Sequence, residues 1–245
     1  MNENKMINAF LLIGQSNMAG RGNVGDVLPI ENKSCFMLRM GRWQPMSEPI
    51  NPDRGIFTGK YRSGVCLAAS FADGYAKATG EPAGLIPCAD GGTSIDQWRE
   101  GGELFDHAVM MTRLALRNSR LCGILWHQGE ADCTDDARVD SYKEKFIRMA
   151  KALRRELSAK DVPILIGELS HSYTIGDREF ADRPERLNSV FYEISCELSK
   201  CAVISSEGLT MKADGLHFDA RSLRIFGERY LDGYFRLKAD NINNV

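Results

Sequence analysis

The 245-residue sequence lacks several features that mark particular classes of protein. It has no run of basic residues and a formal net charge of only −2, so we expect neither nucleic acid nor an anionic membrane as a partner. The apolar run at residues 7–13 is interrupted by Asn8 and is too short to span a bilayer. No small-residue cleavage site follows it, so the sequence predicts neither a leader peptide nor a membrane anchor.

Paired cysteines, repeats and low-complexity linkers are also missing. The seven cysteines are odd in number, show no C-x-x-C spacing and lie mostly in apolar stretches: Cys35, Cys66, Cys88, Cys122, Cys133, Cys196 and Cys201. This usage is typical of reduced, buried thiols and predicts a cytoplasmic protein. With no composition shift along the chain, we expect one domain covering residues 1–245.

Short apolar runs alternate with segments of helical period along the chain. Strands are predicted at residues 9–13, 35–40, 83–88, 122–126, 163–167 and 202–205. Helices are predicted at residues 64–77, 104–116, 139–157, 187–199 and 223–234. The rest of segment 20–63, rich in Gly and Pro, is predicted to form loops. This order is typical of an α/β protein with a doubly wound, mostly parallel sheet.

Four polar clusters fall at or near the predicted carboxyl ends of strands, where such sheets bind ligands: residues 14–18, 90–96, 127–132 and 214–217. In the first, Ser16 follows a buried strand by two residues. A lone Ser there is usually a turn former, but a nearby base would make it a nucleophile. His217 could be that base, because Asp214 three residues earlier can orient its imidazole.

The remaining clusters could supply hydrogen-bond donors to an oxyanion. Gly92, in a Gly-Gly pair, can present its backbone N–H without steric cover, and Gln128 could add a side-chain amide. Glu130 could support His217 or fix neighbouring loops. Residues next to these, namely Gln15, Asn17, Thr93 and Trp98, are predicted to contact the substrate.

Other chemistries compete with this interpretation. His127, Glu130 and His217 could belong to a metal-dependent hydrolase, although HExxH and HxH motifs are absent, and we predict neither a metal nor another cofactor. A non-catalytic carbohydrate-binding module could use Trp43 and Trp98 as stacking platforms. Residues 20–25 match GxGxxG but do not directly follow a predicted strand, so a nucleotide site is not expected.

Taken together, the clusters resemble the SGNH (GDSL-like) hydrolases, and within them the carbohydrate esterase family 6 and sialate O-acetylesterase-like group. The matching strings are FLLIGQSNMAGRG at 10–22, LIPCADGGTSIDQW at 85–98, ILWHQGEAD at 124–132 and DGLHFD at 214–219. They occur in the family's order and span nearly the whole chain.

The resemblance implies a flavodoxin-like three-layer α/β/α sandwich and a serine esterase. It implies Ser16 as nucleophile, with His217 and Asp214 completing a triad, although some relatives use a Glu in the position of Glu130. The oxyanion hole would combine the N–H groups of Ser16 and Gly92 with the amide of Gln128, where the wider superfamily has Asn. The expected substrate is a small-molecule or oligosaccharide acetyl ester, such as an acetylated xylan fragment or sialic acid.

Overall fold

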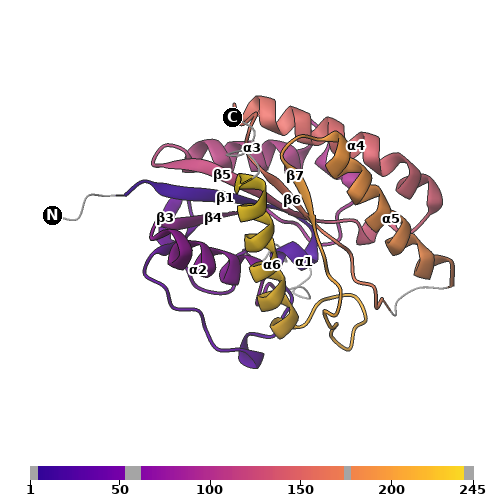
Figure 1. Cartoon of the computed structure of the whole chain (residues 1–245), viewed down its shortest axis with the longest axis horizontal. Helices are drawn as coiled ribbons and strands as arrows, with labels where there is room; N and C mark the ends of the chain where they lie inside the picture. The colour runs from indigo at the N-terminus through magenta and orange to yellow at the C-terminus, as the bar shows by residue number, and fades with distance from the viewer. Residues whose placement is uncertain (1–4, 53–61, 174–177, 240–245) are drawn as a thin grey trace.

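The computed structural model describes residues 5–52, 62–173 and 178–239. Its centre is a seven-stranded sheet in the order β3-β2-β4-β1-β5-β6-β7 (Figure 1). The strands are β1 (Ile7–Gly14), β2 (Cys35–Arg39), β3 (Arg42–Pro45), β4 (Ala83–Pro87), β5 (Ser119–His127), β6 (Ile164–Gly167) and β7 (Cys201–Ile204). Every neighbouring pair is parallel except β2 and β3.

The five strands β4-β1-β5-β6-β7 have the flavodoxin order, and β1 is the middle strand of the full seven-stranded sheet. The chain places β4 on one side of β1 and β5 on the other, so the order reverses at β1. Ligands in such sheets bind at this reversal, beyond the carboxyl ends of the strands. The predicted flavodoxin-like α/β fold is confirmed, and the end of β1 is where a site is expected.

Strand β3 was not predicted. It joins β2 through a two-residue turn in which both Met40 (φ 51°) and Gly41 (φ 74°) have positive φ. Such a turn matches the twist of a hairpin, but its first position usually holds Asn, Asp or Gly. Because Met is an uncommon choice there, the sequence carries no strong signal for the hairpin, and residues 41–45 were predicted to be loop.

Helices cover both faces of the sheet (Figure 1). Their bounds are α1 (Ser16–Ala19), α2 (Leu67–Thr79), α3 (Glu103–Ala115), α4 (Asp136–Glu156), α5 (Arg178–Glu197) and α6 (Ala220–Ala239), with short 3-10 helices at Val24–Asp26, Ile95–Trp98 and Glu130–Asp132. On one face α2 and α6 pack together, with Phe71 and Phe226 in their core. On the other, α3, α4 and α5 bury Phe105, Phe146 and Phe191. None of the helices within the described ranges is long and apolar enough to span a bilayer.

Local signals explain several helix ends. The side chain of Asp135 caps α4 by accepting a hydrogen bond from the Arg138 N–H (2.9 Å). Gly80 ends α2 in the left-handed conformation. Helix α2 begins later than predicted because Val65 instead forms an antiparallel bridge with Gly22. That bridge fastens the long β1–β2 connection beside the end of β1.

Candidate active site

Ser16 lies directly beyond the central strand, at the first position of the short helix α1. The turn requires Gly14, whose φ of 129° favours glycine and whose added Cβ would lie 2.1 Å from the His127 carbonyl oxygen. The N–H of Gln15 donates to the same carbonyl at 2.8 Å. Strand β1 therefore ends tightly against β5, which fixes the position of the Ser16 side chain.

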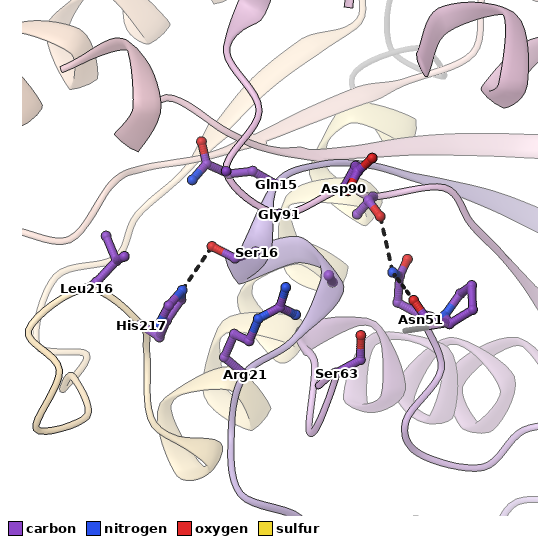
Figure 2. A pocket seen from close by; sticks show the side chains of 13 residues that line it. Gln15, Ser16, Arg21, Asn51, Ser63, Asp90, Gly91, Leu216 and His217 are labelled. Atoms are coloured by element: carbon purple, nitrogen blue, oxygen red, sulfur yellow. Dashed lines mark hydrogen bonds between the residues drawn. The ribbon is translucent and has the colours of Figure 1, made fainter. Parts of the chain in front are cut away.

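His217 reaches Ser16 from the loop between β7 and α6. Met211 and Phe218 form an antiparallel bridge that closes this loop, and the Lys212 N–H donates to the His217 carbonyl at 2.7 Å. Nε2 of His217 lies 3.0 Å from Oγ of Ser16 (Figure 2). The structure thus brings together the predicted nucleophile and base.

Asp214 contacts the other ring nitrogen of His217. Its Oδ2 lies 2.9 Å from Nδ1, and its Oδ1 accepts the N–H groups of Leu216 (3.0 Å) and His217 (2.9 Å). Burial raises the pKa of the Asp214 carboxyl, but these hydrogen bonds outweigh burial and lower the pKa to about 2. The ionised carboxylate can only accept, so Nδ1 of His217 carries the proton and Nε2 accepts that of Ser16.

A pocket of ≈ 380 Å³ opens beside Ser16 and His217 (Figure 2). Its other lining residues come from several loops: Gln15, Ala19, Arg21, Asn51, Pro52, Ser63, Ala89, Asp90, Gly91, Gly92 and Leu216. The volume is at the lower end of the range for small-molecule sites. Sequence reasoning did not single out Arg21, which follows the Ser16 turn within the same string. The guanidinium of Arg21 and the carboxylate of Asp90 thus place opposite charges on the wall of the pocket.

The Gly-Gly loop after β4 lies close to Ser16, as predicted. A Cβ added to Gly91 would be 3.6 Å from Cβ of Ser16 and 2.7 Å from Nη2 of Arg21, so glycine leaves room for the guanidinium. Gly92 has a φ of 75° and lines the same pocket. Both glycines therefore leave bare backbone on the wall of the pocket that Ser16 also lines.

Gln128 does not occupy the predicted position. It is fully buried, and its Nε2 donates to the Asp132 carboxylate (2.6 Å) and to the Thr93 carbonyl (2.8 Å). Its Oε1 accepts the Tyr142 hydroxyl at 2.8 Å. An amide nitrogen has two hydrogens, and these two short bonds use both. This geometry corrects the prediction that Gln128 donates to an oxyanion.

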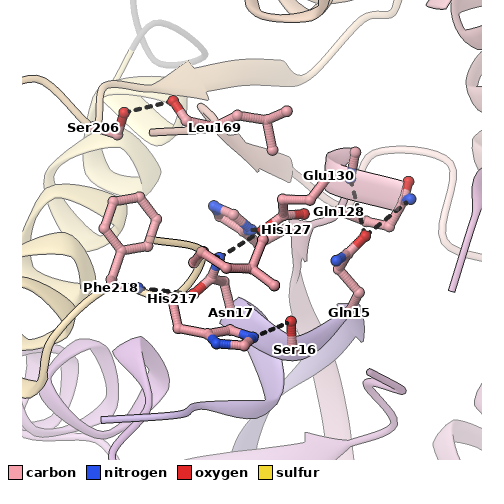
Figure 3. A network of polar contacts seen from close by, with 12 residues as sticks. Gln15, Ser16, Asn17, His127, Gln128, Glu130, Leu169, Ser206, His217 and Phe218 are labelled. Carbon is pink, nitrogen blue, oxygen red and sulfur yellow. Dashed lines mark hydrogen bonds and ion pairs between the residues drawn. The ribbon is translucent and has the colours of Figure 1, made fainter. Parts of the chain in front are cut away.

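Glu130 hydrogen-bonds to Asn17 rather than to His217. Oε1 of Glu130 accepts from Nδ2 of Asn17 at 2.6 Å (Figure 3). The same Asn17 nitrogen donates to the Leu216 carbonyl (3.2 Å), and its Oδ1 accepts the Phe218 N–H (3.1 Å). Asn17 therefore ties Glu130 to both neighbours of His217. Because Asn17 is fully buried, its predicted contact with substrate is corrected to a role in holding the loop.

Two other residues predicted to contact substrate lie in the core. Trp98 is 1% exposed and packs edge-on against Trp126, with ring centroids 5.5 Å apart. Its Nε1 donates to Oγ1 of Thr93 (3.1 Å), which in turn donates to the Asp90 carbonyl (2.8 Å). Thr93 is buried as well. Both residues therefore brace the Gly-Gly loop from the protein interior, which corrects the prediction of substrate contact.

The structure also locates the residues of the two competing interpretations, the metal-dependent hydrolase and the non-catalytic carbohydrate-binding module. His127 is fully buried, its Nε2 lies 3.1 Å from the Glu168 carbonyl oxygen, and burial lowers its pKa. Within the described ranges, no group of three or more His, Cys, Asp or Glu side chains is arranged to hold a metal ion. Trp43 is half-buried, with its ring against Gly84 of β4, and Trp98 is in the core. Trp98 therefore offers no stacking surface, and Trp43 exposes only part of its ring.

The chain is similar to known proteins over nearly its whole length. The family model described as "Carbohydrate esterase, sialic acid-specific acetylesterase" matches residues 6–236. A probable carbohydrate esterase of Arabidopsis thaliana is 32% identical over an alignment of 231 residues, which covers 85% of this chain and 82% of that protein. An X-ray structure of an Arabidopsis thaliana protein has a TM-score of 0.83 at 26% identity, covering 94% of this chain and 98% of that one. The crystal structure of NanS has a TM-score of 0.78 at 15% identity, covering 98% and 100%, and shows the same fold.

Proposed function

This chain belongs to the carbohydrate esterase family described as sialic acid-specific acetylesterase, and from that premise we propose that it removes O-acetyl groups from carbohydrates through an acyl-enzyme on Ser16. The observation that carries the proposal is the series of hydrogen bonds from Ser16 to His217 (3.0 Å) and from His217 to Asp214 (2.9 Å) at the pocket wall. Acetylated xylan-derived oligosaccharides and sialic acids are the proposed substrates.

In the acylation step, Nε2 of His217 accepts the Ser16 proton while Oγ attacks the acetyl carbonyl carbon. The carbonyl π electrons move to oxygen, and the N–H groups of Ser16 and Gly92 are the proposed backbone donors to this oxyanion. Asp214 stabilises the imidazolium that forms. When the tetrahedral intermediate collapses, His217 donates its proton to the departing sugar oxygen and Ser16 keeps the acetyl group.

Deacylation repeats these roles with water. His217 takes a proton from the water molecule, whose oxygen attacks the acetyl carbon of the acyl-enzyme. Collapse of the second intermediate breaks the bond to Ser16 Oγ, which recovers a proton from His217, and acetate leaves. Asp214 is already ionised before either step, because its pKa of about 2 lies far below neutrality.

The composition of the pocket supports a small polar substrate. Its volume of ≈ 380 Å³ suits a short acyl group together with one sugar ring. Arg21, Asp90 and Asn51 provide charged and amide groups that can hydrogen-bond hydroxyl or carboxylate groups of a sugar. A long acyl chain would have to extend past these polar side chains, so we expect turnover to fall with acyl length.

The test is a panel of acetylated sugars and aryl esters of increasing acyl length, measured with wild type and with Ser16→Ala. We expect acetyl esters to be preferred, and Ser16→Ala to lower kcat by roughly 10⁴-fold or more. Near-normal activity of Ser16→Ala would overturn the acyl-enzyme scheme. Loss of wild-type activity on chelation, restored by added metal, would favour the metal-dependent hydrolase instead.

A further inference from the structure

We propose that Lys212 is a positioning residue for the reaction at Ser16: its ammonium group fastens the loop that carries His217 to the segment that follows Ser16. The inference rests on the proposed function, because it concerns how His217 is presented to the nucleophile. It is carried by hydrogen bonds that Lys212 makes to two parts of the site. Its backbone contacts the His217 loop, and its side chain contacts a residue 191 positions away in the sequence.

The backbone of Lys212 shapes the turn that presents His217. Its N–H donates to the His217 carbonyl at 2.7 Å, and its carbonyl accepts the Gly215 N–H at 3.0 Å. Both bonds lie within the His217 loop (residues 211–218), whose two ends form an antiparallel bridge. Asp214 belongs to the same loop, so Lys212, the acid and the base are parts of one closed turn.

The side chain of Lys212 leaves this turn and reaches the segment of the nucleophile. Its Nζ donates to the Arg21 carbonyl at 2.9 Å. Arg21 follows the short helix α1, whose first residue is Ser16, and Arg21 and His217 both line the pocket (Figure 2). An ammonium group can only donate and a carbonyl can only accept, so the direction of this hydrogen bond is fixed. The bond therefore joins the segment of the nucleophile to the loop of the base.

The same ammonium group faces the Asp214 carboxylate. Nζ lies 3.9 Å from Oδ2, the oxygen that contacts Nδ1 of His217. This distance is too long for a hydrogen bond, and with 27% of the Lys212 side chain and 41% of the Asp214 side chain exposed, water screens much of the attraction. The positioning therefore depends chiefly on the bond to Arg21, and the ion pair adds a weaker pull that keeps Oδ2 on the side of His217.

Lys212 and Asn17 hold the His217 loop at different points. Asn17 contacts the two neighbours of His217, whereas Lys212 holds the beginning of the loop. A loop that is held at one point can pivot about it, and a misplacement of about 1 Å can cost about 10²-fold in rate. Nε2 of His217 lies 3.0 Å from Oγ of Ser16, so such a pivot would lengthen the contact through which the proton moves. Lys212 itself does not line the pocket, so we expect its loss to lower kcat and to leave KM nearly unchanged.

The first experiment compares Lys212→Met and Lys212→Arg with wild type on an acetyl ester. We expect Lys212→Met to lower kcat about 10- to 100-fold with KM within about twofold of wild type. Lys212→Arg keeps the charge and the N–H donors, so it should stay within about threefold of wild type. Lys5→Met is the matched control, because Nζ of Lys5 also contacts a backbone carbonyl, that of Gly80 (3.0 Å), and a carboxylate, that of Glu81 (3.2 Å). We expect it to have wild-type kcat.

The second experiment measures the second-order rate at which diethyl 4-nitrophenyl phosphate inactivates each protein. Oγ of Ser16 attacks the phosphorus atom while His217 takes its proton, and 4-nitrophenolate leaves, so this rate reports on the two side chains without carbohydrate binding. We expect Lys212→Met to react about 10- to 100-fold more slowly than wild type and Lys212→Arg to react nearly as fast. Thermal unfolding checks the fold of each variant. If Lys212→Met does not fold, Lys212→Gln replaces it with the same expected loss, because it removes the charge and shortens the side chain.

Three results would overturn the assignment. They are a kcat of Lys212→Met within about threefold of wild type, a loss in Lys212→Arg as large as that in Lys212→Met, and an equal loss in Lys5→Met. A change confined to KM would also overturn it, because Lys212 would then act on substrate binding. Activity retained by Ser16→Ala would instead overturn the proposed function, so the two failures are distinguishable.

Discussion

Asn17 and Glu130 lie 113 residues apart in the sequence and share a buried hydrogen bond of 2.6 Å. The same Asn17 amide holds Leu216 and Phe218, the two neighbours of His217. The catalytic loop proposed here is therefore fastened to the turn that carries Ser16, and Glu130 is a positioning residue behind that contact. Four predictions concern this arrangement and the fold that supports it.

The first prediction separates the two candidate partners of His217. Asp214→Asn should lower kcat by about 10³–10⁴-fold, because an amide no longer stabilises the imidazolium and can select the wrong tautomer. Glu130→Gln should cost less than about tenfold, since the new amide oxygen still accepts from Asn17. Steady-state kinetics on one acetyl ester measures both. Collapse of Glu130→Gln with normal Asp214→Asn would reassign the third member to Glu130.

The second prediction tests whether Asn17 positions the His217 loop, by exchanging the amide at position 17 with the carboxylate at position 130. Asn17→Asp places two carboxylates together in a buried site, so we expect it to lower both kcat and the free energy of unfolding. Adding Glu130→Gln lets the new amide at 130 donate to the new carboxylate at 17, which still accepts from Phe218. The double variant should recover about tenfold in kcat over Asn17→Asp alone. If Asn17→Asp is as active as wild type, Asn17 does not position the loop.

The third prediction concerns the turn after β1. Gly14→Ala should lower the free energy of unfolding by about 2–4 kcal/mol, because the added methyl would collide with the His127 carbonyl at a φ of 129°. Gly25→Ala is the matched control, since a Cβ there meets nothing within 4 Å and we expect a change below about 0.5 kcal/mol. Urea unfolding of both variants and of wild type measures these changes in the free energy of unfolding. Equal stabilities would show that the turn is not sterically constrained.

The fourth prediction uses His171, which lies between Glu185 (2.7 Å from Nδ1) and Glu168 (3.3 Å from Nε2). Burial lowers the pKa of His171, but hydrogen bonds to the two carboxylates outweigh it and raise the pKa. A raised folded pKa means that the stabilisation is fully present below the unfolded value, about 6.5, and is lost as pH rises through the folded pKa.

Urea unfolding of wild type and His171→Gln between about pH 6 and pH 9 measures this contribution. The difference in free energy of unfolding should shrink toward the alkaline end. Glu185→Gln should reduce the pH dependence of wild type in the same range, because it removes one of the two carboxylates. A difference that stays constant with pH would contradict the prediction.

Much of the fold was predictable because its signals are local. In the described part of the chain, the period of apolar residues located six of the seven strands and five of the six α-helices, with the four-residue α1 and the edge strand β3 missed. Placing the polar clusters beyond strand ends then predicted that Ser16, Gly92 and His217 would line one pocket, which they do. Asp214 was predictable because its partner is only three residues away.

The errors at the site share one physical cause. Gln128, Trp98 and Thr93 lie in functional-looking strings, yet their side chains point into the protein interior. In a tight loop after a strand, successive side chains can face the pocket or the core, and nothing in the residue types distinguishes the two. Asp132, in the 3-10 helix Glu130–Asp132, and Tyr142, in α4, fix the orientation of Gln128 by hydrogen bonds.

The sequence by itself determined the α/β layering and the glycine turns. It also determined that a nucleophile, a base, an acid and side-chain amides lie near the ends of strands, because each of these features depends on residues close together in the chain. Only the tertiary structure decided which amide faces the pocket, and that Glu130 supports the His217 loop through Asn17. The contact between Glu130 and Asn17 joins residues more than a hundred positions apart, and the orientation of Gln128 depends on Thr93 and Tyr142, which tertiary packing brings to it.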